Sequence, residues 1–350
     1  MIHGVSAEFT PGRKLARGFY HEVVAPILSD TPHSAALLGW GSDVLGFDTP
    51  RSTDHGWGPR LQIFVRDEEV STVDARLEAE LPETYGGWPV RFGWDDVPAS
   101  NHVDVAELGR WVEERLGFDP RPSPTYRQWL AAPQQLLLEL TAGAVFRDDA
   151  ARLLALRTSL AWYPDDVWLW LLACQWRRID QEEPLVGRTA EVGDELGSRV
   201  IAARLVRELI RLAFLLERRY APYSKWLGTA FRELESYEDV GPALDAALAA
   251  RDHNVREAAL VSAAEALARR HNALGITEPV EASARPFHSR PFRVLGSRRF
   301  VDACLARIQD PWLLSLPPVG GIDQLSDSTD VLSVPATSAR VARFYDDQPS

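Results

Sequence analysis

A glycine-serine pair that follows an apolar segment is the first feature of this chain with the chemistry of a binding site. Gly41 and Ser42 come after the apolar residues 35–38, and Asp54 precedes a second apolar run at 61–65. Glycine lets the backbone approach phosphate groups closely, and the serine hydroxyl and nearby N–H groups can donate hydrogen bonds to them. A carboxylate such as Asp54 can hold Mg²⁺. This stretch therefore predicts a site for a triphosphate and a metal ion.

This stretch resembles the nucleotidyltransferase superfamily, in the polymerase-beta-like branch of the kanamycin-, lincosamide- and streptomycin-modifying enzymes and the minimal nucleotidyltransferases. The pattern of that branch is Gly-Ser on a short helix, Asp-x-Asp on the next strand and a third carboxylate on a later strand. Gly41, Ser42 and Asp54 match its first parts, and Asp104 in the alternating segment 102–105 is the candidate third carboxylate. The resemblance implies transfer of a nucleoside monophosphate from a Mg²⁺-bound nucleoside triphosphate to a hydroxyl or amine, with release of pyrophosphate. Asp54 and Asp104 would hold the Mg²⁺.

The second acid of Asp-x-Asp falls on Gly56. Residues two apart on a strand share a face, so positions 54 and 56 are both expected to point at the metal. Glycine has no ligand atom to offer, although Asp43 or Asp48 could substitute for the missing acid. Two functions stay open: an active nucleotidyltransferase, and a catalytically degenerate nucleotide-binding sensor or interaction protein.

Composition limits the class of protein. The chain has 350 residues, of which 45% are hydrophobic, and this is enough for two or three domains. It shows neither an uninterrupted apolar stretch of about 20 residues nor a signal peptide, so we expect a soluble, cytoplasmic protein without a membrane partner. The formal net charge of −12 argues against a general nucleic-acid binder and favours a small-molecule acceptor, with a protein acceptor also open.

The N-terminal residues 1–118 predict an α+β domain, in which a small mixed sheet is flanked by helices. A segment rich in proline, 119–124, makes a natural linker to the rest of the chain. Apolar spacing places the helices at 12–28, 70–81 and 106–116, and the strands at 35–38, 61–65, 90–94 and 102–105.

Residues 125–310 predict a mainly α-helical bundle domain, because apolar residues recur at three-to-four spacing along most of this region. The expected helices are 125–141, 150–160, 165–180, 194–219, 242–250 and 255–271. Four tryptophans between 159 and 176 are interpreted as bundle core rather than as a base-stacking surface. The remaining segment, 311–350, is expected to be irregular, with a frayed tail.

A loop in the helical region combines charged and aromatic residues around a proline. Arg219, Tyr220, Tyr223 and Lys225 surround Pro222, and Lys225 is one of only two lysines in the chain. The tyrosines could stack on a nucleobase while the two cations reach the phosphates. The segment also resembles the helical half of an uncharacterised bacterial family described as nucleotidyltransferase-like with a C-terminal domain of unknown function, and this resemblance implies no substrate.

Two further polar groups in the helical region have alternative interpretations. Glu182 and Glu183 close a predicted helix, and either could be the base that deprotonates an acceptor hydroxyl, a role that the resemblance assigns to an acid of the helical domain. They could equally be a solvated helix end. Arg204, Arg207 and Arg211 share one face of a long helix, where they form either structural ion pairs or a stripe that faces phosphate.

Overall fold

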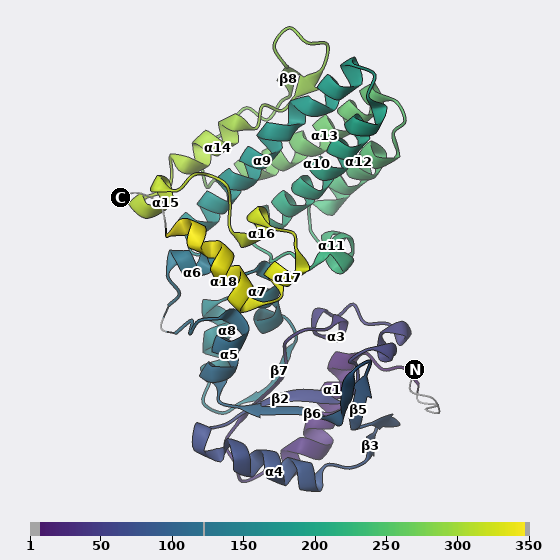
Figure 1. The fold of residues 1–350 in the computed structure, drawn as a ribbon, viewed down its shortest axis with the longest axis vertical. Coiled ribbons are helices and arrows are strands. Elements are labelled where there is room, and N and C mark those ends of the chain that lie inside the picture. Colours follow the sequence, from purple (N-terminus) through teal and green to yellow (C-terminus); the bar gives the residue numbers. More distant parts are fainter. Residues whose placement is uncertain (1–7, 122, 347–350) are drawn as a thin grey trace. The chain divides into compact units, whose positions relative to one another are not determined.

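The computed structural model describes residues 8–121 and 123–346, which divide into two compact units (Figure 1). The sheet unit contains the described residues up to 124 together with 136–161, and the helical unit contains 125–135 together with 162–346. The sequence analysis assigned 136–161 to the helical domain. These residues join the sheet unit because 144–148 form a strand that pairs with the first strand of the sheet. The predicted fold class, a small mixed sheet followed by a mainly helical region, is confirmed.

Five strands form a mixed sheet in the order β5-β6-β2-β1-β7. Strand β2 runs parallel to β6 and antiparallel to β1, and β7 and β5 are antiparallel edge strands. The strands are β1 (Ser34–Leu37), β2 (Arg60–Phe64), β5 (Arg91–Trp94), β6 (Val97–Ala106) and β7 (Ala144–Asp148). Four of these were expected from the apolar runs. Strand β7 was missed because it lies between two helical patterns.

Apolar side chains from alternate positions of the strands make one face of the sheet the core of the unit. Leu61 and Ile63 of β2 are fully buried there and pack with Phe19 and Val73. The helices on this face are α1 (Gly12–Phe19), which continues through a π-helical turn (Tyr20–Val24) into α2 (Ala25–Ile27), and α4 (Val70–Glu80). The remaining strand positions, which point to the opposite face, are therefore the ones that can form a site.

Polar side chains occupy that opposite face at the centre of the sheet. In the register of the parallel pair, Arg60 lies beside His102, and Gln62 lies beside Asp104. Helix α5 (Leu108–Leu116) packs on the same side through an edge contact of its Trp111 with Phe64. The smaller elements of the unit are α3 (Ser42–Leu45), the 3₁₀ helices Pro50–Asp54 and Asp67–Glu69, strands β3 (Thr84–Tyr85) and β4 (Trp88–Pro89), α7 (Gln134–Thr141), which begins in the helical unit, and α8 (Arg152–Ser159).

Long antiparallel helices build the helical unit, and the predicted aromatic core is confirmed. Trp168, Trp170 and Trp176 are buried on α9. The helices are α6 (Tyr126–Ala131), α9 (Asp165–Glu191), α10 (Glu195–Leu216), α11 (Ser224–Phe231), α12 (Tyr237–Ala249), α13 (His253–Ala273) and α14 (Arg298–Leu305). Helix α9 passes through Pro184 although the predicted helix ended at 180. Packing overrides the helix-breaking effect of proline, since Pro184, Val186 and Gly187 are all buried in the bundle.

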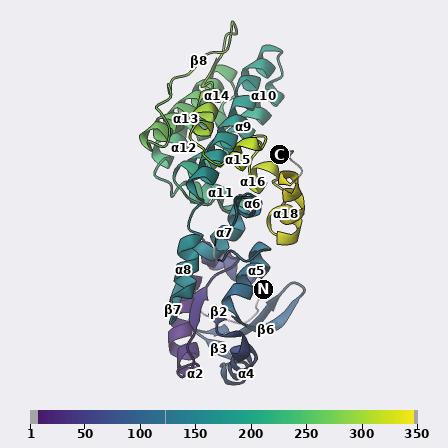
Figure 2. The same ribbon diagram turned by 90° about the vertical axis from the view of Figure 1, so that its left-hand side faces the viewer.

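A hairpin and a run of short helices complete the unit. Strands β8 (Arg285–Pro286) and β9 (Arg293–Val294) form the hairpin, which extends beyond the bundle in both views (Figure 2). The C-terminal segment, expected to be irregular, contains α15 (Pro311–Ser315), α16 (Ile322–Leu325), α17 (Thr329–Leu332), α18 (Pro335–Val341) and a 3₁₀ turn (Ala342–Tyr345). The end of the predicted frayed tail, 347–350, lies outside the described residues. No helix in the described part of the chain is long and apolar enough to cross a bilayer.

Candidate functional site

The loop between β1 and α3 carries the predicted Gly-Ser pair and has an unusual backbone. Gly39 and Gly41 have φ angles of +86° and +129°, which favour glycine. A Cβ atom at Gly41 would fall on the guanidinium of Arg60 and on the carboxylate of Asp43. Gly41 is thus required by the close packing of two protein side chains. Its predicted approach to phosphate, and that of Ser42 at the start of α3, stay predictions.

A buried ion pair joins this loop to the centre of the sheet. Arg60 Nε donates to one carboxylate oxygen of Asp43 at 2.9 Å, and Nη2 donates to the other at 2.7 Å. The two side chains are only 7% and 3% exposed. Arg60 also donates to the backbone oxygen of Trp40, and its guanidinium lies 5.0 Å from the centre of the Trp40 ring. Bidentate geometry and burial make this pair a strong structural link between β2 and α3.

The predicted position of Asp54 on a strand is wrong. Asp54 ends a 3₁₀ helix and forms a largely exposed ion pair with Arg51 at 3.3 Å, whereas strand β2 begins only at Arg60. Gly56 has a φ of +60°, and a Cβ atom there would collide with the Trp40 ring. Position 56 therefore could not hold an acid without rearrangement of Trp40.

Asp48, a predicted metal ligand, is bonded within the protein instead. Its Oδ2 accepts hydrogen bonds from the backbone N–H of Gly12 at 2.6 Å and from the indole N–H of Trp57 at 3.0 Å. The carboxylate thereby holds the start of α1, where the free N–H groups of a helix favour a negative charge. Asp48 is thus committed to the fold of the sheet unit.

Asp104 lies on strand β6 and faces the polar side of the sheet. Its side chain is 45% exposed, accepts the indole N–H of Trp111 at 2.7 Å and lies 3.8 Å from Arg115. The strand that follows the Gly-Ser helix is β2, and its two positions on this face hold Arg60 and Gln62 rather than acids. Gln62 Oε1 accepts the backbone N–H of Leu38 at 2.7 Å. Both β2 side chains therefore hold the Gly-Ser loop in place.

The described residues do not fit the magnesium centre that the family pattern implies. Nowhere in 8–121 or 123–346 do three or more His, Cys, Asp or Glu side chains gather as metal ligands would. The two polar side chains of β2 on this face, Arg60 and Gln62, provide no carboxylate for Mg²⁺, and the nearby carboxylate of Asp43 is bonded to Arg60. Of the predicted ligands Asp48, Asp54 and Asp104, Asp104 faces the cavity described next.

An open cavity of about 660 Å³ covers the polar face of the sheet, and aromatic rings form one of its walls. The Trp40 and Trp94 rings are 5.5 Å apart between centroids, and His102 lies 5.2 Å from Trp94. Trp40 is 40% exposed, so its ring is accessible to a ligand. Burial lowers the pKa of His102, which therefore adds no charge at neutral pH. These rings form a surface on which a planar ligand can stack.

Arg115 supplies the cation of this cavity and was missed by the sequence analysis. Its guanidinium stacks on Trp111, 4.0 Å from the ring centre. The guanidinium also lies 3.8 Å from the position that a Cβ atom on Gly39 would take. The Nε atom is buried and forms no hydrogen bond in the described structure. Burial lowers the pKa of Arg115, yet an arginine stays charged at neutral pH. A partly buried guanidinium that lines the cavity suits an anionic group of a ligand.

The predicted nucleotide-binding loop of the helical unit does not assemble as expected. Tyr220 is buried, with its ring 5.0 Å from Trp162 and 5.3 Å from Tyr163, so burial contradicts its predicted stacking on a base. Arg219 donates to the backbone oxygen of Glu233 at 3.1 Å. Tyr223 is 42% exposed, and Lys225 lies 4.9 Å from the ring of Trp226. The phosphate-binding roles of Arg219 and Lys225 stay predictions.

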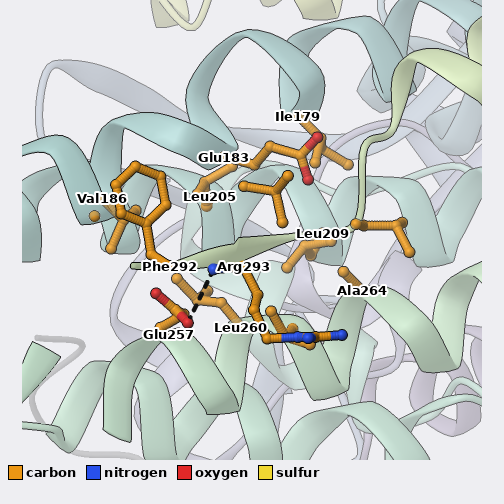
Figure 3. Close-up of a pocket in the computed structure, with 14 residues that line it drawn as sticks. Ile179, Glu183, Val186, Leu205, Leu209, Glu257, Leu260, Ala264, Phe292 and Arg293 are labelled. Carbon is orange, nitrogen blue, oxygen red and sulfur yellow. Dashed lines mark hydrogen bonds between the residues drawn. The ribbon is translucent and has the colours of Figure 1, made fainter. Parts of the chain in front are cut away.

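Glu183, one of the two predicted bases, faces an apolar cavity inside the helical unit (Figure 3). Its two oxygens accept the backbone N–H groups of Gly296 at 3.2 Å and of Ser297 at 2.8 Å, just before α14. Leu205 and Leu209 line the same cavity, whose volume of about 30 Å³ is suited to no more than a water or two. The other predicted base, Glu182, lies 3.6 Å from Arg204. Glu183 is thus engaged in holding the loop before α14.

Removal of Arg60 tests whether the buried pair supports the fold of the site. We expect Arg60→Met to lower the free energy of unfolding by about 3–5 kcal/mol, because Asp43 is left buried without a partner. The double variant Arg60→Met/Asp43→Asn should be more stable than Arg60→Met alone, since the uncompensated charge is gone. Urea denaturation followed by tryptophan fluorescence measures both. Arg51→Met, which breaks an exposed pair, is the matched control and should cost less than about 1 kcal/mol. A double variant whose loss of stability equals the sum of the losses of its two single substitutions would contradict the assignment.

Stability as a function of pH tests the burial of Glu183. Burial raises the pKa of this carboxyl from an ordinary value of 4.5 to about 7. The folded protein therefore keeps a proton that the unfolded chain loses, and stability falls as the pH rises from about 4.5 to 7. Relative to Glu183→Gln, the wild type should lose about 3 kcal/mol over this range. Urea denaturation at several pH values, with Glu182→Gln as control for loss of one carboxylate, checks this; a constant difference would refute it.

The chain has limited similarity to known proteins. Residues 129–227, a minority of the chain, match the family model of a domain of unknown function (DUF4037). No curated protein matches the chain. Among solved structures, a nucleotidyltransferase-like protein from Exiguobacterium sibiricum 255-15 is similar over 79% of this chain and 82% of that one, at 12% sequence identity and a TM-score of 0.32. A likeness at this level leaves the function to be argued from the residues of the site.

Proposed function

We propose that the sheet unit binds a nucleotide in the cavity beside Trp40 and Arg115 and does not transfer it with the help of a metal. The observation that carries this proposal is the occupation of strand β2. The two polar side chains that β2 presents to this face are Arg60 and Gln62 rather than acids, and both are bonded to the Gly-Ser loop. Of the two functions that the sequence left open, the geometry favours the catalytically degenerate nucleotide-binding protein.

The aromatic wall supports recognition of a nucleobase. Trp40 and Trp94 present ring faces at the edge of a cavity whose volume, about 660 Å³, is within the range of small-molecule sites. Stacking on aromatic rings accepts any base and contributes about 1–3 kcal/mol for each base in single-stranded nucleic-acid complexes. Asn101 and His102 line the same cavity, where the Asn101 amide is bonded to Glu78 and Val103 and Nε2 of His102 to the backbone oxygen of Phe92.

Arg115 supports recognition of phosphate without a metal ion. The guanidinium lines the same cavity as the aromatic wall, and its side chain is 29% exposed. Asp104 lies 3.8 Å away, too far for a hydrogen bond, and Glu139 is a second acid that acts on the charge of Arg115. A phosphate oxygen can form a stronger, charge-assisted bond there.

Metal-dependent transfer to a small-molecule acceptor stays a prediction with less support. Asp104 faces the cavity as the third carboxylate of the pattern would, but Asp54 and Asp48 are bonded elsewhere. Glu182 and Glu183, the predicted bases, are engaged with Arg204 and with the backbone before α14. We derive no catalytic step from these residues.

Calorimetric titration with ATP, GTP, CTP and UTP tests the proposal. We expect at least one nucleotide to bind equally well in Mg²⁺ and in a chelator, because the site holds the phosphates through Arg115 rather than through a cation. Arg115→Gln should weaken binding roughly tenfold or more, since a charge-assisted hydrogen bond is lost. Arg110→Gln removes an exposed arginine of the same helix that pairs with Glu114 at 3.4 Å, and this matched control should bind like the wild type.

A parallel assay of pyrophosphate release separates the two functions. The proposal predicts no release above background for the wild type with any of the four triphosphates. Mg²⁺-dependent release that Asp104→Asn abolishes would replace the proposal with an active nucleotidyltransferase. Absence of binding to all four nucleotides would refute nucleotide recognition itself.

A further inference from the structure

A second cavity lies wholly within the helical unit, where α16 meets α9 and α10 (Figure 1). Its volume is about 590 Å³. Arg178 of α9 and Arg204 and Arg207 of α10 line it, opposite residues 323–327 of the C-terminal segment. Three acids, Glu208, Asp323 and Asp327, line the same cavity, and the proposed nucleotide site does not use any of these residues.

Two of these arginines have only loose partners. Arg204 lies 3.6 Å from Glu182, and Arg207 lies 3.4 Å from Asp327 and 4.0 Å from Glu208. These separations exceed the 2.7–3.2 Å of ordinary N–H···O hydrogen bonds. Arg204 and Arg207 are three residues apart on one helix, so their guanidinium groups lie on the same side of α10. Both therefore keep hydrogen-bond donors for another acceptor.

The third arginine and the buried acids form the fixed wall of the cavity. Arg178 donates to both oxygens of Glu208, at 2.9 and 3.2 Å, and to the backbone oxygen of Gln324 at 2.7 Å. The amide of Gln175 also donates to Glu208, at 2.8 Å. Asp323 accepts the backbone N–H of Gln134, and Arg211 donates to the backbone oxygen of Asp323. The charge of Glu208 is thus compensated by neighbours within the protein, whereas burial raises the pKa of the Asp323 carboxyl.

Asp327 differs from these acids because its side chain is exposed to solvent. Its side chain is 74% exposed, and it belongs to the short connection between α16 and α17. Its carboxylate lies beside Arg207, at the position where an anionic oxygen of a ligand would be placed. An exposed ion pair of this kind is worth little, so an anion with more negative charge can displace it.

We propose that this cavity binds the phosphate group of a small phosphorylated molecule or of a polyphosphate, with Arg204 and Arg207 as its ligands. Phosphate fits because its oxygens can accept bonds from several guanidinium groups at once. The sequence left open whether Arg204 and Arg207 form ion pairs or face phosphate. The loose ion pairs allow both, with Asp327 as the group that phosphate replaces. This inference does not depend on the nucleotide site of the sheet unit.

Titration of the full chain with inorganic phosphate and with tripolyphosphate, in chloride buffer without divalent ions, tests the proposal. We expect saturable binding of at least one of them, and the preferred probe separates a single phosphate group from a phosphate chain. Arg204→Gln/Arg207→Gln should weaken that binding roughly tenfold or more. Asp327→Asn should strengthen it about two- to fivefold, because a competing carboxylate is gone. This opposite sign cannot result from a loss of folding.

A matched control variant makes the outcome decisive. Arg199→Gln removes an exposed arginine of the same helix, whose Nε donates to the backbone oxygen of Glu195 and which does not line the cavity. It should leave phosphate binding unchanged. Equal affinities for the wild type, the double arginine variant and Asp327→Asn would overturn the proposal. Absence of binding to both the wild type and Asp327→Asn would also overturn it.

Discussion

The buried ion pair between Arg60 and Asp43 is the interaction on which the candidate site of the sheet unit depends. It joins strand β2 to the turn before α3, and it explains why Gly41 cannot carry a side chain. A charge buried without its partner is strongly destabilising, so neither residue can change alone. The pair also occupies both oxygens of Asp43, which the sequence analysis offers as a substitute metal ligand, so this carboxylate is not available to a cation. The same contact thus stabilises the loop and disfavours a bound cation.

Several acidic side chains accept hydrogen bonds from backbone N–H groups and are therefore engaged in the fold rather than in catalysis or metal binding. Asp48 holds the start of α1, Glu183 holds the loop before α14, and Asp194 accepts the N–H of Gly197 at the start of α10. The physical reason is that N–H groups at helix starts and in tight loops have no partner within their own element. A carboxylate nearby satisfies them and gains from the positive end of the helix. The acids that remain accessible in the two cavities include the half-exposed Asp104 and the exposed Asp327, beside arginine and tryptophan side chains.

Apolar spacing was sufficient to predict the architecture, but a shift of a few residues hid the site. The run 61–65 predicts β2 correctly, yet the strand begins at Arg60, and this polar first residue is the one that bonds Asp43. Asp54 was expected on a strand because it lies close to that run. Gly56 and Gly58, which do not favour a strand, lie between Asp54 and the start of β2. Arg115 was read as part of an amphipathic helix, since its neighbours Asp104 and Gly39 are distant in sequence. Tyr220 was misjudged because a proline nearby suggests an exposed loop, while tertiary packing buries its ring against Trp162.

The most direct test of the account is a crystal structure of the protein with a bound nucleoside triphosphate in the presence of Mn²⁺, with anomalous scattering used to locate the metal. The account predicts a base against Trp40 or Trp94, phosphate density beside Arg115, and no anomalous peak at coordination distance from Asp104. A Mn²⁺ ion held jointly by Asp104 and the phosphates, with Arg60 displaced from Asp43, would contradict it and would restore the transferase prediction.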